Sequence, residues 1–156
     1  MSTVIAVLHV VCAVFIVGPM AILPMTAMRS IRAGEGPQVV ALSKSTRLFS
    51  LLSLLVIVFG FGAMGMSEFN ISFGATWIWL SILLYVVALG LALFLIVPVM
   101  QRTGEALIAT ATPGTQTDTA SPGVAVPQSG YGAIAAGSGI TALCLLVIVI
   151  LMVWKP

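Results

Sequence analysis

Charged residues are scarce in this 156-residue chain, where Asp, Glu, Lys and Arg together make up 6% of the sequence. Water-soluble domains carry about 25% charged residues, whereas 60% of this chain is hydrophobic. So few charges cannot cover so much apolar surface, which excludes a water-soluble fold. The net charge of +2 rests on six basic and four acidic residues. That balance indicates no nucleic-acid partner, and we expect none.

The chain also lacks the residue sets that membrane enzymes and ion pumps use. His9 is the only histidine, and Cys12 and Cys144 have neither the spacing of a disulfide framework nor that of a zinc site. No phosphate-binding loop or metalloprotease motif occurs. Ion transport uses carboxylates, histidine chains or charged pairs inside the membrane. We therefore expect a protein that is not an enzyme and that holds no cofactor.

What the sequence has instead is four long apolar runs, at residues 3–28, 48–66, 73–100 and 132–154. A helix needs about 20 apolar residues to cross the hydrocarbon core of a bilayer. Each run reaches or nearly reaches that length, and none contains Asp, Glu, Lys or Arg between its ends. The pattern predicts an all-α, integral membrane four-helix bundle that forms a single domain over residues 1–156. The predicted helices lie at about 3–28, 37–66, 73–102 and 132–154.

Two segments outside the apolar runs refine this prediction. Gly36-Pro37 favours a helix start, because proline suits the first helical position, so the second helix should begin before it enters the membrane. Residues 103–131 are rich in Thr, Ser, Pro and Gly, a composition that cannot bury a core. We expect them to form a low-complexity cytoplasmic loop that contacts a partner. The third helix can alternatively continue past residue 102 as an amphipathic tail to Ala111.

The basic residues gather in two of the three predicted loops. Residues 29–47 and 101–131 hold five of the six Lys and Arg residues, whereas residues 67–72 hold only Glu68. Lys and Arg are in excess in cytoplasmic loops. We therefore expect a multi-pass protein of the bacterial plasma membrane with its first and third loops inside. The N-terminus and the C-terminus would then both lie outside.

Two prolines interrupt the first apolar run. Pro19 and Pro24 each remove one backbone hydrogen bond and clash with the carbonyl four residues earlier, at Phe15 and Met20. The freed carbonyls need a neighbouring helix or water when the helix lies in lipid. We expect a kink at these prolines, which serves packing or acts as a hinge or ligand site.

His9 is the only histidine, and it lies inside the first apolar run, about two turns from its start. Ionisable residues at such positions are candidates for function. A neutral His9 would donate a hydrogen bond to a helix backbone or to a partner subunit. The alternative is a haem or copper ligand, with Met64 or Met66 on the second helix at a matching depth. A haem held by two histidines of one chain is excluded.

The first loop carries the only cluster of charge, formed by Arg29, Arg32, Lys44 and Arg47. In the simplest interpretation these residues only set the topology of the protein and contact lipid headgroups. Basic pockets between helices on the cytoplasmic side also bind anionic lipids such as cardiolipin. We therefore treat the four residues as candidate ligands of an anionic phospholipid.

The first helix contains an L-H-x-x-x-A-x-x-x-x-G-P pattern, formed by Leu8, His9, Ala13, Gly18 and Pro19. In this pattern and in its helix layout the chain resembles a family of small four-helix integral-membrane proteins of actinobacteria. It is similar, more narrowly, to the small accessory proteins of actinobacterial respiratory supercomplexes, which join a cytochrome bc complex to a terminal oxidase. This resemblance implies no catalytic residues. It implies partners among cytochrome oxidase and cytochrome bc subunits.

These observations favour a non-catalytic accessory subunit that packs against a larger membrane complex, most simply a respiratory supercomplex. A haem- or copper-handling membrane protein that uses His9 is the alternative. A small-molecule permease that works as an oligomer is disfavoured, because the predicted helices offer no polar face to line a path.

Overall fold

The computed structural model of the protein describes residues 2–65, 76–111 and 128–154. Within these ranges the chain is helical apart from the turn at residues 33–35, and it contains no strand. Four helical spans of this described part are long and apolar enough to cross a membrane, namely Thr3–Arg32, Gly36–Gly65, Thr76–Ala111 and Gly130–Trp154. The predicted all-α bundle with four membrane-crossing helices is therefore confirmed.

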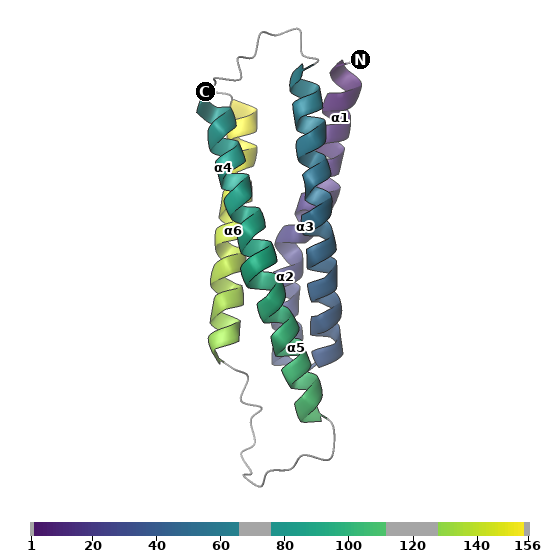
Figure 1. Ribbon diagram of the computed structural model, residues 1–156, viewed down its shortest axis with the longest axis vertical. Coiled ribbons are helices and arrows are strands. Elements are labelled where there is room, and N and C mark those ends of the chain that lie inside the picture. Colours follow the sequence, from purple (N-terminus) through teal and green to yellow (C-terminus); the bar gives the residue numbers. More distant parts are fainter. Residues whose placement is uncertain (1, 66–75, 112–127, 155–156) are drawn as a thin grey trace.

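Two of the four spans contain a π-helical segment. The first span comprises α1 (Ser2–Cys12), η1 (Ala13–Val17) and α2 (Gly18–Arg32). The second is α3 (Gly36–Gly65), and the fourth is α6 (Gln128–Trp154). The third comprises α4 (Thr76–Gly90), η2 (Leu91–Ile96) and α5 (Val97–Ala111). Figure 1 shows the spans running along the long axis, with the start of α1 and the end of α6 at the same end of the molecule.

Each π-helical segment lies directly before a proline. η1 precedes Gly18-Pro19, and η2 precedes Val97-Pro98. Membrane helices tolerate proline because local π-helical turns, among other adjustments, absorb the disturbance to the hydrogen-bond ladder. The kink predicted at Pro19 thus lies next to the π-helical segment η1. Pro24 lies inside α2, where it is fully buried, and a hinge at either proline remains a prediction.

The turn between α2 and α3 is tighter than the sequence indicates. α2 continues four residues beyond the predicted end at residue 28, and α3 begins at Gly36. Gly34 has a φ of +74°, its amide donates to the Ile31 carbonyl at 3.1 Å, and the Glu35 amide donates to the Ser30 carbonyl at 3.0 Å. These two bonds form a Schellman motif, which satisfies the last carbonyls of α2. The last turn of α2, which carries Arg29 and Arg32, is therefore capped by backbone hydrogen bonds.

The third span continues past residue 102 to Ala111, which is the end of the amphipathic tail offered as the alternative. The loop expected at residues 103–131 begins later, because α5 continues to Ala111; residues 112–127 lie outside the described part. α5 crosses the start of α3 at two glycines. A Cβ on Gly36 would lie 2.8 Å from the Gly104 carbonyl oxygen, and a Cβ on Gly104 would lie 2.7 Å from Cγ2 of Val40. This backbone contact packs the extra turns of α5 against α3.

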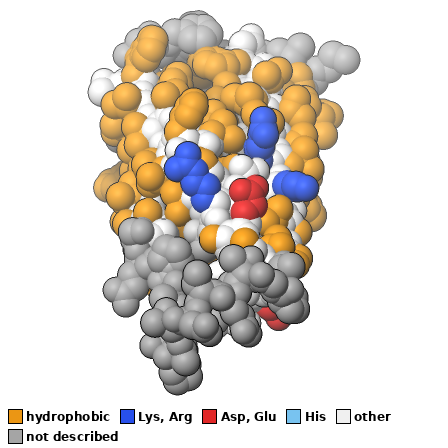
Figure 2. All heavy atoms as spheres, turned by 60° about the horizontal axis from the view of Figure 1, so that its bottom comes forward, with side chains coloured by type: hydrophobic (Ala, Val, Ile, Leu, Met, Phe, Trp, Pro, Cys, Tyr) orange, Lys and Arg blue, Asp and Glu red, His pale blue; other side chains and the backbone are white. Residues whose placement is uncertain are grey.

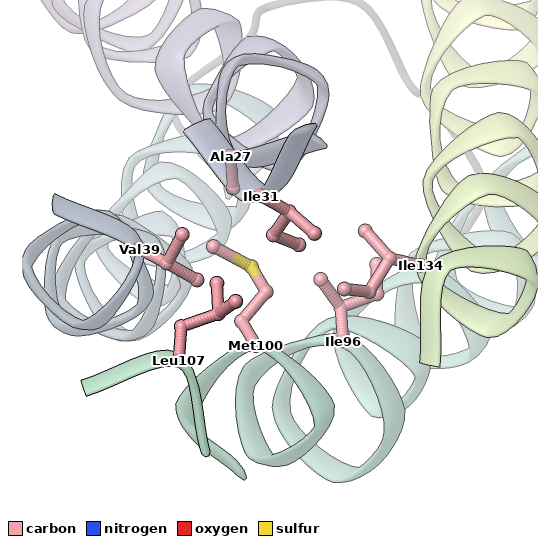
Figure 3. Close-up of a cluster of buried hydrophobic side chains, with 7 residues drawn as sticks. All are labelled: Ala27, Ile31, Val39, Ile96, Met100, Leu107 and Ile134. Carbon is pink, nitrogen blue, oxygen red and sulfur yellow. The ribbon is translucent and has the colours of Figure 1, made fainter. Parts of the chain in front are cut away.

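The main hydrophobic cluster lies at one end of the bundle. Figure 3 shows its members, which come from all four spans: Ala27, Ile31, Val39, Ile96, Met100, Leu107 and Ile134. Met100 is 0% exposed, and its side chain lies in the middle of the group (Figure 3). We call this end the closed half; it comprises α2, the first half of α3, η2 with α5, and the first half of α6.

The opposite end, which we call the open half, comprises α1, the second half of α3, α4 and the second half of α6. Here the helices form two pairs, since α1 packs along α3 and α4 packs along α6. Figure 1 shows that the two pairs lie apart at the end where α1 begins. α3 and α4 are joined nearer the middle of the bundle, where Ser53 Oγ lies 2.6 Å from Tyr85 Oη.

Candidate functional site

The basic side chains of the described residues lie toward the closed end of the bundle. Arg29 and Arg32 occupy the last turn of α2, Lys44 and Arg47 lie in the first half of α3, and Arg102 lies in α5. Figure 2 shows this end, where basic side chains gather around an acidic one and hydrophobic side chains surround them. Charge at one end and an apolar belt above it are typical of a helix bundle that meets a lipid headgroup layer.

A pocket of about 290 Å³ opens at this end between α2 and α6. Its lining residues are Met25, Met28, Arg29, Arg32, Tyr131, Ala135 and Ser138. The two arginines and the tyrosine form its polar side, whereas the methionines and the alanine form an apolar wall. The pocket therefore offers positive charge and apolar surface to the same ligand.

Arg32 and Tyr131 hold the two sides of the pocket together. A terminal guanidinium nitrogen of Arg32 donates a hydrogen bond to the Tyr131 hydroxyl, and its Cζ lies 5.0 Å from the centre of the Tyr131 ring. Arginine over an aromatic face is attracted by the ring quadrupole. Among the described residues no carboxylate forms a salt bridge with Arg29 or Arg32. Most N–H groups of the Arg32 fork thus remain available to an anion.

The structure divides the four basic residues that the sequence groups together. Lys44 and Arg47 do not line the pocket. They share a helical face with Val40, since residues four and seven apart lie on one side of a helix, and Val40 faces Gly104 of α5. Lys44 and Arg47 therefore lie on the side of α3 toward α5, whereas Arg29 and Arg32 lie between α2 and α6.

Tyr131 is the pocket residue that the sequence does not reveal. It falls at the edge of the expected loop, one residue before the predicted fourth helix, and lies 99 residues from Arg32. An aromatic residue at the interfacial end of a membrane helix is a weak signal. Only the packing of α6 beside α2 brings it to the arginines.

His9 lies between α1 and α3, where it contacts the helix backbone. Its Nδ1 lies 2.8 Å from the carbonyl oxygen of Val56. A carbonyl only accepts, so Nδ1 carries the proton. A Cβ on Gly60 would lie 3.0 Å from the His9 Cε1, so glycine at that position leaves room for the imidazole ring. The backbone is thus the partner of His9 within the described residues.

One face of α3 is polar and buried, which the sequence analysis missed. Ser43, Thr46, Ser50 and Ser53 are each 0% exposed. Their spacing of three and four residues was the available signal, because it places all four on one helical face. The premise that the helices offer no polar face is therefore wrong.

Two of these four hydroxyls, those of Thr46 and Ser53, bond within the protein. Thr46 donates to the Leu42 carbonyl at 2.8 Å, and Ser53 donates to the Ser50 carbonyl at 2.6 Å. Ser53 has one proton, so the Tyr85 hydroxyl donates to Ser53. The remaining hydroxyl oxygens of this interior, those of Ser43, Ser50 and Thr141, are buried without a hydrogen-bond partner in the described part of the chain.

No group of three or more His, Cys, Asp or Glu residues that could hold a metal ion occurs among the described residues. Cys12 and Cys144 are free and half-buried. Met64 lies in α3, whereas Met66, the other expected partner of His9, lies outside the described residues.

A family model described as "Predicted integral membrane protein (DUF2269)" matches residues 3–156. The chain belongs to this family. DUF2269 membership, together with four apolar helical spans, establishes a multi-pass integral membrane protein and agrees with the membrane family that the first helix resembles. No curated protein and no solved structure matches the chain.

Proposed function

We propose that this DUF2269 protein is a non-catalytic accessory subunit that packs against a larger membrane complex. Its partner would insert a transmembrane helix between the α1–α3 pair and the α4–α6 pair of the open half. The observation that carries the proposal is that residues of α3 and α6 that are buried in the closed half are followed, on nearly the same helical faces, by exposed residues in the open half.

On α3 the change in exposure is seen at Phe61. It follows Ser50 by 11 residues, which places it within about 20° of Ser50 around the helix. Ser50 is 0% exposed, whereas Phe61 is 45% exposed. Residues at nearly the same angular position on α3 are therefore buried at Ser50 and exposed at Phe61.

On α6 the same change in exposure is seen at Met152. It follows Thr141 by the same interval of 11 residues, and the exposed fraction rises from 2% at Thr141 to 40% at Met152. Two large apolar side chains, one on each helix pair, are thus partly exposed in the open half. A helix of a second protein would cover them, since apolar helices pack through such side chains in a bilayer.

The class of partner comes from resemblance. The likeness of the first helix to accessory proteins of actinobacterial respiratory supercomplexes favours cytochrome oxidase and cytochrome bc subunits. We place the protein in the bacterial plasma membrane with its closed, basic end in the cytoplasm and both termini outside. In this arrangement the open half lies toward the outer surface.

An affinity purification in digitonin tests the proposal. The tagged protein would be extracted from membranes of the organism that makes it, followed by mass spectrometry and a visible spectrum of the eluate. We expect oxidase and cytochrome bc subunits with their haem bands. A colourless eluate that contains this chain alone would refute the accessory role.

The alternative, a haem- or copper-handling protein, has one observation in its favour. The bond from Nδ1 of His9 to a backbone carbonyl leaves Nε2 as the nitrogen with a lone pair, an arrangement common in metal-binding histidines. An absorbance scan and a metal analysis of the purified protein separate the two functions. A Soret band or bound copper that disappears in His9→Ala would favour the alternative.

A further inference from the structure

We propose that the pocket between α2 and α6 binds the phosphate of one anionic phospholipid. The proposal concerns the closed half and is independent of the accessory role, which concerns the open half. It narrows the expected lipid contact from four scattered basic residues to Arg29 and Arg32, with Tyr131 as a positioning residue.

The first argument is charge. Arg29 and Arg32 lie one helical turn apart on α2, and both line the pocket. Within the described residues neither forms a salt bridge, so nothing in that part of the chain neutralises them. A phosphate accepts hydrogen bonds from arginine in a bidentate geometry, and two arginines favour an anionic headgroup over a zwitterionic one.

The second argument is preorganisation. The Tyr131 hydroxyl accepts a hydrogen bond from Arg32, and the ring lies beneath the guanidinium. Held in this way, Arg32 loses less conformational freedom when a ligand binds. Tyr131 lies in the first turn of α6, where backbone N–H groups have no helical partner and the helix dipole adds positive potential. The pocket therefore combines side-chain and helix-end attraction for one anion.

The third argument is the apolar wall. Met25 and Met28 precede the arginines on α2 and line the same pocket. Because α2 ends at the closed end of the molecule, the two methionines lie closer to the middle of the bundle than the arginines do. A ligand with its phosphate at the arginines would place an acyl chain along these two methionines. Free inorganic phosphate uses the charge but not this wall, so the geometry favours a lipid.

The fourth argument is depth. α3 has 30 residues, which corresponds to about 45 Å of helix, and the hydrocarbon core is about 30 Å thick. Arg29 and Arg32 end a first span of the same length. When the uncharged residues before Arg29 fill the core, the two arginines reach the level of lipid phosphates.

Native mass spectrometry and thermal unfolding of the full chain in dodecyl maltoside test the proposal. The added probes are dioleoylphosphatidylglycerol, dioleoylphosphatidylcholine and inorganic phosphate, at about 0.15 M salt to screen exposed charges. We expect one tightly bound phosphatidylglycerol that raises Tm. The double variant R29Q/R32Q should weaken this binding on the order of tenfold or more, because charge-assisted hydrogen bonds are lost.

The matched control is K44Q/R47Q, which removes the same charge from α3 and should leave the affinity unchanged. Tyr131→Phe keeps all charges and should weaken binding less than R29Q/R32Q. Equal losses in the two double variants would show general surface attraction and overturn the proposal. Equal binding of phosphatidylcholine would overturn it as well, as would equal stabilisation by inorganic phosphate. The Tm of each variant without lipid shows whether it folds.

Discussion

At the residue scale, one contact between buried hydroxyl groups connects α3 to α4. The bond between Ser53 and Tyr85 joins α3 to α4 at 2.6 Å, just before the two helix pairs separate. Hydrogen bonds between membrane helices average about 0.6 kcal/mol and reach about 1.7 kcal/mol. This contact therefore adds a modest stabilising term between α3 and α4 near the boundary of the two halves.

A double-mutant cycle measures the contact. Ser53→Ala, Tyr85→Phe and the double variant would be unfolded in detergent micelles, and we expect a coupling free energy of about 0.6–1.7 kcal/mol. Ser81→Ala is the control, because Ser81 also lies on α4 but donates only to the Trp77 carbonyl of its own helix. A coupling of Ser53 to Ser81 as large as that to Tyr85 would contradict the assignment.

The buried hydroxyl face of α3 and the pocket between α2 and α6 differ in how far the sequence predicts them. Ser43, Thr46, Ser50 and Ser53 form a readable periodic pattern, so that face was predictable from spacing. The Arg32–Tyr131 contact was not, because helix packing alone brings together two residues 99 positions apart. The backbone contact of His9 with Val56 was expected in kind, but its partner depended on how α1 lies on α3.

At the element scale, glycine determines how closely α3 and α5 approach. The four spans were predictable because hydrophobicity, length and missing charge all indicate the same segments. The end of α5 at Ala111 agrees with the amphipathic tail that the sequence offered, and its buried face packs against α3, with Thr103 and Leu107 both 5% exposed. Composition alone did not choose between this tail and the loop expected from residue 103, because only the contact with α3 shows which side of α5 is buried.

Replacing Gly36 by Ala tests this crossing. The new Cβ would lie 2.8 Å from the Gly104 carbonyl oxygen and 2.8 Å from the Ile108 amide nitrogen, and backbone atoms cannot rotate away. Overpacking of this kind costs about 1–3 kcal/mol, so we expect a lower Tm by circular dichroism in detergent.

Gly132→Ala is the matched control, because Gly132 also lies near a helix start and a Cβ there meets nothing within 4 Å. Its stability should be unchanged or slightly higher, since alanine favours helix over glycine. Equal destabilisation by the two substitutions would contradict the close crossing of α3 and α5.

At the scale of the whole molecule, the two halves of the bundle differ in what they bury. Composition predicted a membrane bundle, and the structure and the family match agree. The open half could not be predicted, because α3 continues as one helix from Ser50 to Phe61, whereas the exposed fraction rises from 0% to 45% between these residues. The topology with both termini outside stays a prediction from the positions of five basic residues.

The most direct test of the accessory role is photocrosslinking in the membranes of cells that naturally make the protein. A benzophenone amino acid would replace Phe61 or Met152, the exposed residues that the proposal places against the partner helix. It would replace Leu83 as a control, since Leu83 is 61% exposed on the face of α4 opposite Ser81 and Tyr85. We predict protein adducts of defined mass from Phe61 and Met152 and none from Leu83. Adducts with lipid alone at Phe61 and Met152 would contradict a partner helix in the open half.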